Sequence, residues 1–208
     1  MKTVRVGKKL TVKYDRRSSI KRKTGETSVE LRLDIDGEGK SSVATGIPFF
    51  DHMLTLFAKH GSFDLKLKAK GDIEVDYHHT VEDIGICLGK AFLEALGDKE
   101  GIVRYGEAKV PMDESLTEAI VDICGRPHLT YNVEITKVKF KDFDVEVVRE
   151  FFEAFVMNSG ITIHINLIRG RNLHHKIESI FKAFAVALSK ACAIEPGRRG
   201  IPSTKGIL

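Results

Sequence analysis

Residues 78–97 read HHTVEDIGICLGKAFLEALG, and residues 174–193 read HHKIESIFKAFAVALSKACA. Aligned without a gap, residues 78–96 and 174–192 share six identities, three of them apolar and three of them His, His and Glu. In each stretch the apolar residues recur at helical spacing, so we expect one helix in each half of the chain. A shared helix face explains the apolar identities but not a repeated His-His-x-x-Glu motif. The repeat therefore indicates an internal duplication that kept a functional motif in both copies.

The elements expected around the two motifs follow the same order in both halves. In the first half, alternation predicts a strand over 28–36 and two strands around Gly71, and helical spacing predicts a helix over 48–60. In the second half the expected strands are 116–124, 129–135 and 161–168, with a helix over 144–159. We assign no element to the basic stretch before residue 24. Layer packing favours an α+β fold of two similar halves, each a small sheet with two helices on one face. The halves are placed at residues 1–97 and 98–195, followed by a tail, 196–208.

Composition excludes several classes of protein. Of the 208 residues, 42% are apolar and 30% charged, which permits a sizeable core and excludes wholesale disorder. The net charge of +4 does not demand a nucleic-acid partner, although it suits a small anionic ligand. No apolar run approaches membrane-spanning length, and the N-terminus has no apolar signal core. The three cysteines lack disulfide-framework and zinc-finger spacing, so we expect buried, reduced thiols in a cytoplasmic protein.

The two His-His-x-x-Glu motifs point to metal binding. Residues four apart share a helix face, so His78 lies beside Glu82 and His174 beside Glu178. The adjacent histidine is turned ~100° away, so each pair suits two ions, or one ion here and one on a neighbouring subunit. Imidazole plus carboxylate without thiolate suits Mn, Fe, Co, Ni or Zn. The order of residues differs from the His-Glu-x-x-His of zinc proteases, so that hydrolase class gains no support.

Other polar residues have weaker claims when taken alone. His52 and Glu150 lie near the starts of the helices that precede the two motifs, so each could complete a metal shell, although a lone histidine is more often structural. His60, His128 and His164 belong to no motif. Arginine and lysine side chains near turns and helix ends suit a phosphate, but a solvated tail has the same composition. These residues are Arg104, Arg126, Lys182, Arg198, Arg199 and Lys205.

With these residues in view, the chain resembles the imidazoleglycerol-phosphate dehydratases of histidine biosynthesis. The resemblance runs from about residue 22 to 208. It rests on GIPFFDHML at 46–54, HHTVED at 78–83, GRP at 125–127, residues 172–184, and PSTKG at 202–206. It implies an α+β duplication in which each half is a four-stranded sheet with two helices on one face, as in the second domain of a ribosomal small-subunit protein. It also implies a homo-oligomer of 24 subunits with active sites between subunits.

The same resemblance implies a cofactor and a set of ligands. Two Mn²⁺ ions would occupy each active site. One ion is implied to be bound by His52, His79, Glu82 and His175. The other is implied to be bound by His78, His174, Glu178 and Glu150, the last at a position where histidine is expected. Substrate contacts are implied at Glu26, His52, His60, His78, Glu82, Arg104, Arg126, Lys182, Ser203, Thr204 and Lys205.

The implied reaction is the dehydration of imidazole-glycerol phosphate to imidazole-acetol phosphate, through a metal-bound imidazolate. Glu178 and Glu26 are the candidate proton carriers, and the tail 196–208 is expected to close over the site. Other classes of protein remain as alternatives. A phosphatase on the same fold would share the His/Glu cluster and the basic tail. A metal-storage protein would share the ligands but leave the tail unexplained. Nucleic-acid binding is disfavoured because the chain has no tryptophan and a nearly balanced charge.

Overall fold

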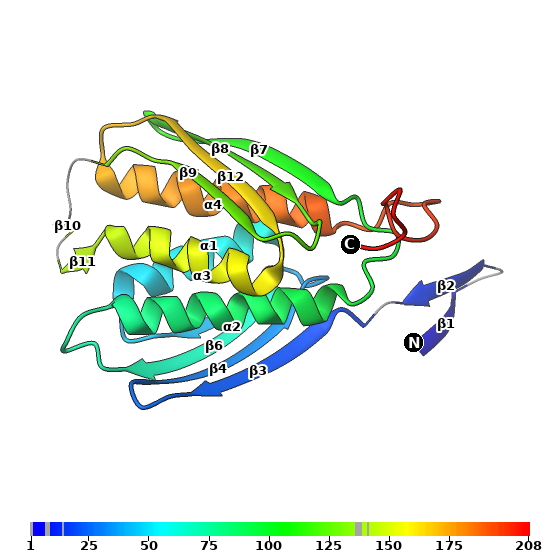
Figure 1. The fold of residues 1–208 in the computed structure, drawn as a ribbon, viewed down its shortest axis with the longest axis horizontal. Coiled ribbons are helices and arrows are strands. Elements are labelled where there is room, and N and C mark those ends of the chain that lie inside the picture. Colours follow the sequence, from blue (N-terminus) through cyan, green and yellow to red (C-terminus); the bar gives the residue numbers. More distant parts are fainter. Residues whose placement is uncertain (1, 7–8, 14, 136–138, 141) are drawn as a thin grey trace.

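The computed structural model describes residues 2–6, 9–13, 15–135, 139–140 and 142–208. Two short hairpins lie outside the main sheets in this part of the chain. Their strands are β1 (Lys2–Val6), β2 (Lys9–Lys13), β10 (Lys139–Phe140) and β11 (Phe143–Asp144). The other strands form two sheets, and four helices lie in the layer between them (Figure 1).

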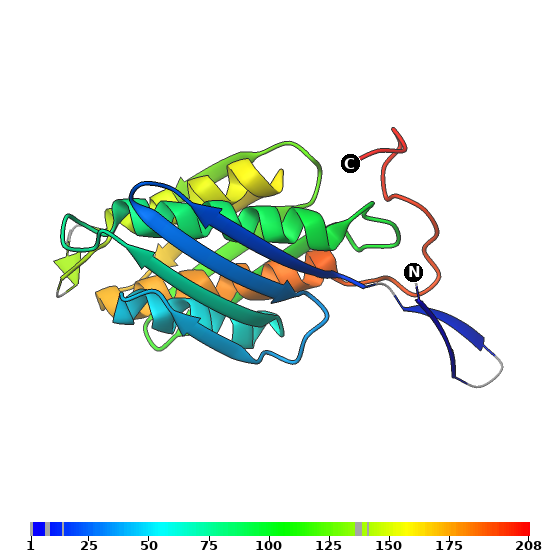
Figure 2. The same cartoon turned by 90° about the horizontal axis from the view of Figure 1, so that it is seen from below.

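The first sheet contains four strands from the first half of the chain. They are β3 (Arg17–Lys23), β4 (Thr27–Asp34), β5 (Ser41–Ala44) and β6 (Asp64–Gly71). Their order is β3-β4-β6-β5, with β5 parallel to β6 and the other pairs antiparallel. On β4 the alternate residues Val29, Leu31 and Leu33 are buried, because successive side chains point to opposite faces of a strand. Helices α1 (Pro48–Gly61) and α2 (His78–Leu96) cover the buried face, and the other face is open in Figure 2.

The second sheet repeats this arrangement. Its strands are β7 (Tyr105–Met112), β8 (Ser115–Asp122), β9 (His128–Asn132) and β12 (Thr162–Arg169). Their order is β7-β8-β12-β9. The parallel pair, β12 and β9, lies at one edge of the sheet, as the pair β6 and β5 does in the first sheet, and the other pairs are antiparallel. Helices α3 (Glu146–Ser159) and α4 (Leu173–Cys192) cover one face. The α+β fold of two duplicated halves, each with four strands and two helices, is therefore confirmed.

The helix layer joins the halves, because α1 packs on α4 and α2 packs on α3. On α2, a Cβ at Gly85 would lie 2.7 Å from the carbonyl oxygen of Phe151, and one at Gly89 would lie 2.5 Å from that of Phe155. Glycine at these two positions therefore lets α2 and α3, which run parallel to each other, pack closely. All four helices begin at one end of the molecule, and the C-terminal tail lies toward the other (Figure 1). We call these the motif end and the tail end.

The two short hairpins were not predicted; within the two main sheets, three strands were missed and one expected strand does not form. Strand β3 lies in the basic segment before residue 24, where we expected no helix or strand. It pairs with β4 as an edge strand and carries one apolar residue, Ile20. Strands β5 and β7 were also missed. Residues 72–77 alternate but form a turn, with the Val75 N–H bonded to the Asp72 carbonyl. Strand β6 already has a neighbour on both sides, so no position beside it is left for a hairpin partner.

Candidate active site

Both His-His-x-x-Glu motifs begin a helix at the motif end. His78 is the first residue of α2, and in α4 the side chain of Asn172 accepts a hydrogen bond from the His174 N–H at 2.9 Å as the N-cap. The two rings of each pair lie in nearly perpendicular planes, at 88° in both motifs. Adjacent histidines therefore face different directions, as helical geometry predicts.

One cluster combines α1 with the second motif. His52, His174 and Glu178 each offer a ligand atom, and these atoms lie within 4.8 Å of one another. Glu178 Oε2 is 2.9 Å from His174 Nε2 and 3.5 Å from His52 Nε2, and Glu178 Oε1 is 2.5 Å from Lys182 Nζ. Two imidazoles and a carboxylate are donors that a divalent transition metal accepts, so the cluster fits such an ion.

The charge state of Glu178 suits this role. Its carboxylate is buried, which raises its pKa, but hydrogen bonds from Lys182 and His174 outweigh burial and lower that pKa. Glu178 is therefore ionised at neutral pH. His60, in the last turn of α1, lies in the same electrostatic neighbourhood, because burial and the charge of Lys182 lower its pKa.

The first motif has its own acidic partners. His79 Nδ1 lies 3.0 Å from Asp72 Oδ2 and 3.8 Å from Glu26 Oε2. The hydrogen bond to Asp72 raises the pKa of His79. The structure thus brings the predicted Glu26 to the motif and adds Asp72, which the sequence did not single out. Asp72 directly follows β6, at the place where a further strand was expected.

The second motif has an acidic partner that was also missed. His175 Nδ1 lies 2.8 Å from Glu114 Oε2, in the turn between β7 and β8. Glu114 Oε1 accepts the backbone N–H groups of Arg171 and Asn172 at 2.9 and 2.7 Å. The hydrogen bonds from His175 and these amides hold the pKa of Glu114 well below its usual range, and the bond to Glu114 raises the pKa of His175. No sequence spacing links a turn residue to a helix start 61 positions away.

Three predicted metal ligands, His78, Glu82 and Glu150, do not join these clusters, and the ring of His78 lies beside that of His79. Glu82 is half-buried one turn after His78. Glu150 lines a 540 Å³ groove with Tyr131, Arg149 and Glu153, and none of the residues that line it is a histidine. Among the described residues, His52, His174 and Glu178 are the group whose ligand atoms converge.

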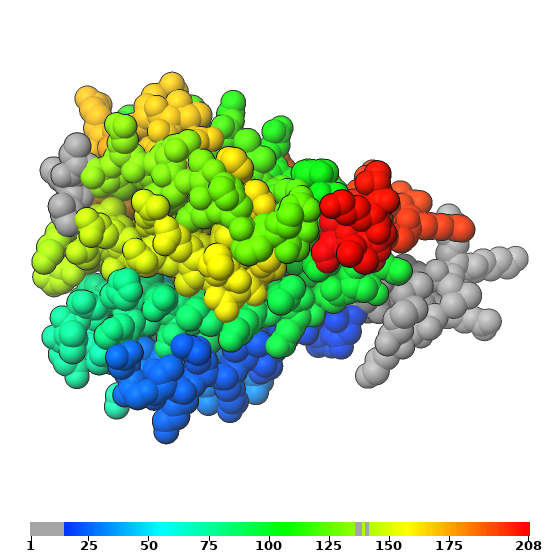
Figure 3. All heavy atoms as spheres, in the orientation of Figure 1, coloured from blue at the N-terminus to red at the C-terminus, as the bar shows by residue number. Residues whose placement is uncertain are grey.

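Several predicted substrate residues lie at the tail end. Arg104 bonds through Nε to Asp122 at 2.7 Å and through Nη1 to the Pro202 carbonyl at 2.8 Å, which ties it to the tail. Its backbone N–H bonds to the carbonyl of Ala191, 17 residues after His174 on α4 and thus about 26 Å along the helix. Ser203, Thr204 and Lys205 are in the tail itself, the red surface of Figure 3. Within one chain, Lys182 and His60 therefore lie near the cluster of His52, His174 and Glu178. Arg104 and the tail lie far from that cluster.

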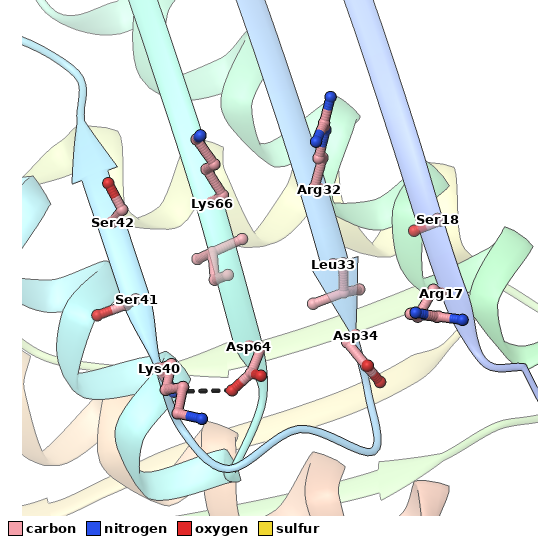
Figure 4. A pocket seen from close by; sticks show the side chains of 11 residues that line it. Arg17, Ser18, Arg32, Leu33, Asp34, Lys40, Ser41, Ser42, Asp64 and Lys66 are labelled. Carbon is pink, nitrogen blue, oxygen red and sulfur yellow. Dashed lines mark hydrogen bonds between the residues drawn. The ribbon is translucent and has the colours of Figure 1, made fainter.

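A further groove, of 410 Å³, opens on the outer face of the first sheet (Figure 4). Arg32 and Lys66 stand on neighbouring strands, and Asp34 and Asp64 lie at its end. The residues that line it include no histidine, so it is separate from the clusters above. No helix among the described residues is long and apolar enough to span a membrane.

Comparison with known proteins agrees with the fold and the motifs. A model of the family "imidazoleglycerol-phosphate dehydratase" matches residues 45–188. An imidazoleglycerol-phosphate dehydratase of Pelobacter propionicus is 56% identical over 193 residues, which cover 93% of this chain and 99% of the relative. One from Oceanobacillus iheyensis is 58% identical over 193 residues, covering 93% and 100%.

Solved structures give the same result. Imidazoleglycerol-phosphate dehydratase from Staphylococcus aureus aligns with a TM-score of 0.79 and 44% identity, covering 86% of this chain and 99% of that one. The enzyme from Pyrococcus furiosus aligns with a TM-score of 0.79 and 35% identity, covering 91% and 100%. The chain therefore belongs to the imidazoleglycerol-phosphate dehydratase family of hydro-lyases.

Proposed function

We propose that this chain is a Mn²⁺-dependent cytoplasmic enzyme that converts imidazole-glycerol phosphate to imidazole-acetol phosphate in histidine biosynthesis. The observation that carries the metal dependence is the convergence of His52, His174 and Glu178 within 4.8 Å, at a motif that the chain contains twice. Imidazole and carboxylate donors without thiolate match Mn²⁺ and related ions.

The proposed ligand sets are those that the sequence implied. His52, His79, Glu82 and His175 would hold one ion, and His78, His174, Glu178 and Glu150 the other. Within one chain His52 lies beside His174 and Glu178, which belong to the other set, so the two ions would be neighbours. Bound divalent ions would supply Lewis acidity and a template for the imidazole ring. The placement of Glu150 in a separate groove makes it the member of the set that most needs a direct test.

Two glutamates are proposed to move protons. Glu178 is buried and ionised, and its two oxygens are oriented by Lys182 and by the histidines of the cluster. Glu26 is more exposed, with 58% of its side chain accessible beside His79, so it exchanges protons readily with solvent. A carboxylate that accepts a proton from carbon needs a fixed position, which favours Glu178 as the base and Glu26 as the group that exchanges the proton.

The active site is proposed to form between copies of the chain. Built from bonds of about 1.5 Å, the substrate is on the order of 10 Å long, so it does not bridge the about 26 Å between His174 and the tail end. A second copy would bring Arg104, Arg126, Ser203, Thr204 and Lys205 to the phosphate, opposite Lys182 of the first. This geometry supports a closed homo-oligomer, for which we propose 24 subunits. The tail, 196–208, would then close over a neighbour's site, and the halves would end at residues 97 and 195.

A turnover assay tests the proposal. Protein stripped with a chelator should be inactive, and Mn²⁺ should restore ketone formation at about two ions per chain. Metal content, inorganic phosphate and mass in solution would be recorded on the same samples. Release of inorganic phosphate without ketone would replace the dehydratase by a phosphatase. Turnover that is unaffected by metal removal would refute the metal dependence.

A further inference from the structure

In both motifs, the second histidine contacts a carboxylate from a turn that directly follows a strand. Asp72 Oδ2 lies 3.0 Å from His79 Nδ1, and Glu114 Oε2 lies 2.8 Å from His175 Nδ1. The same ring nitrogen is engaged in both cases. The first histidine of the second motif differs, since His174 uses Nε2 to reach Glu178.

The two carboxylates are not copies of each other. Asp72 follows β6, whereas Glu114 lies in the turn between β7 and β8. The counterpart of that turn in the first half joins β3 to β4 and contains Glu26, which stands 3.8 Å from His79. The halves therefore reached the same contact from different elements. Duplication alone does not explain it, which points to a requirement of the histidines themselves.

An ionised carboxylate only accepts hydrogen bonds, so its partner nitrogen must carry the proton. A neutral imidazole has one N–H, and placing it on Nδ1 leaves the lone pair on Nε2. Ligating histidines commonly have their other N–H held in this way, which fixes the ring orientation and the tautomer. The contacts to Asp72 and Glu114 thus prepare Nε2 of His79 and His175 to bind a metal.

Glu114 is itself fixed in position. Its Oε1 accepts two backbone N–H groups at the start of α4, from Arg171 and Asn172, while Oε2 faces His175. The two amide bonds fix Oε1 as an acceptor and leave Oε2 directed at the ring nitrogen of His175. The turn and the helix start are joined through this one side chain.

We propose that Glu114 and Asp72 are positioning residues that select the Nδ1–H tautomer of His175 and His79 and direct Nε2 of each toward the metal. This inference deepens the proposed function and rests on it for the identity of the ion. The tautomer, however, is a property of the metal-free protein and is measurable without any ion.

The decisive variant is Glu114→Gln, which keeps the shape of the side chain. Two N–H donors face Oε1 and only one faces Oε2, so the amide oxygen should stay on the backbone groups and the amide NH₂ should face His175. Nδ1 must then accept, which moves the proton to Nε2. For His79 the variant is Asp72→Ala, which removes the acceptor, because among the described residues Asp72 Oδ1 has no partner that would hold an asparagine oxygen away from the ring. Glu118→Gln is the matched control, because Glu118 on β8 bonds to Lys109 and Asn166 and to no histidine.

Two measurements are made on each variant. Magic-angle-spinning ¹⁵N spectra of metal-free, histidine-labelled protein report the tautomers whatever the size of the assembly. Electron paramagnetic resonance of free Mn²⁺ gives the metal affinity. We expect Glu114→Gln to convert one histidine from the Nδ1–H to the Nε2–H form and to weaken Mn²⁺ binding about 10–100-fold, with Glu118→Gln unchanged.

The outcomes separate the two proposals. Unchanged tautomers and affinity in Glu114→Gln would overturn the positioning role, as would a lower melting temperature with unchanged affinity, because Glu114 would then only brace the turn. If Glu114→Gln does not fold, Asp72→Ala decides by the same readings on His79. A tautomer change in a protein whose wild-type form binds no Mn²⁺ would uphold the positioning of the ring and refute the proposed metal instead.

Discussion

Two inactive variants of this chain should restore each other's activity when they assemble together. His174→Asn removes a ligand at the motif end. Lys205→Glu reverses a charge in the tail, where the ammonium group has no partner among the described residues. The two positions are separated by most of the length of α4, about 26 Å from His174 to Ala191, plus the tail that follows. A site that uses both must take them from different chains.

The expected activity follows from the fraction of motif ends and tail ends that are intact in the mixed assembly. In an assembly of equal parts, half of the motif ends are intact, because they belong to the Lys205→Glu chains, and half of the tails are intact, because they belong to the His174→Asn chains. A site formed between two chains then has both ends intact in about a quarter of cases. A site formed within one chain would have both ends intact in none.

The assay is co-expression with two different affinity tags, purification over both, and turnover of imidazole-glycerol phosphate. Activity near a quarter of wild type is expected, against background for either variant expressed with a differently tagged copy of itself. Mass in solution confirms that mixed assemblies were recovered. Background activity in verified mixed assemblies would refute the argument that the motif end and the tail end of different copies form one site.

Further predictions follow from single positions. If Glu150 is a metal ligand, Glu150→Gln should lower bound Mn²⁺ from about two ions per chain to about one. An unchanged Mn²⁺ content would show that another side chain is the fourth ligand, and His164 would be tested next. Gly89→Ala places a Cβ 2.5 Å from the Phe155 carbonyl oxygen, so overpacking should exceed the gain in helix propensity and lower the urea-unfolding free energy by about 1 kcal/mol. Burial raises the pKa of the Cys192 thiol to about 12, so a thiol reagent should modify it only after unfolding. The pKa of Glu178 is lower in the folded than in the unfolded protein. Its contribution to stability is therefore present at pH values above the ordinary pKa of 4.5 and is lost as the pH falls through the folded pKa. Glu178→Gln should make the melting temperature of the metal-free protein less sensitive to acid.

The parts of the fold that were predictable from sequence are those that bury long periodic faces. Helix α4 was expected over 174–193 and spans Leu173–Cys192, because thirteen of its residues are buried and fix the pattern. Strand β4 was predicted for the same reason, with Val29, Leu31 and Leu33 facing the core. Edge strands lack this signal. Strand β3 is held by pairing with β4, and its burial involves one apolar side chain, so its sequence resembles a solvated basic segment.

The candidate site also has parts that were predictable from sequence and parts that were not. The motifs were readable because residues four apart meet on a helix whatever the tertiary fold, as His174 and Glu178 do at 2.9 Å. The contacts of Asp72 and Glu114 were not readable, since they depend on where a sheet places its turns beside a helix start. His60 and Lys182 required the packing of α1 on α4 before they could be assigned to one neighbourhood.

The direction of the helices explains why one chain separates the two sets of residues. In each half, a helix must run back along the sheet between parallel strands, and the helix after the last strand runs the same way, so all four helices start at one end. The motifs at the helix starts therefore gather at the motif end, while Arg104 and the tail follow the helix ends. Duplication thus concentrated the metal-suited groups instead of dispersing them. Except for Lys182, the phosphate-suited groups lie at the opposite end, which is why we propose that another copy of the chain supplies them.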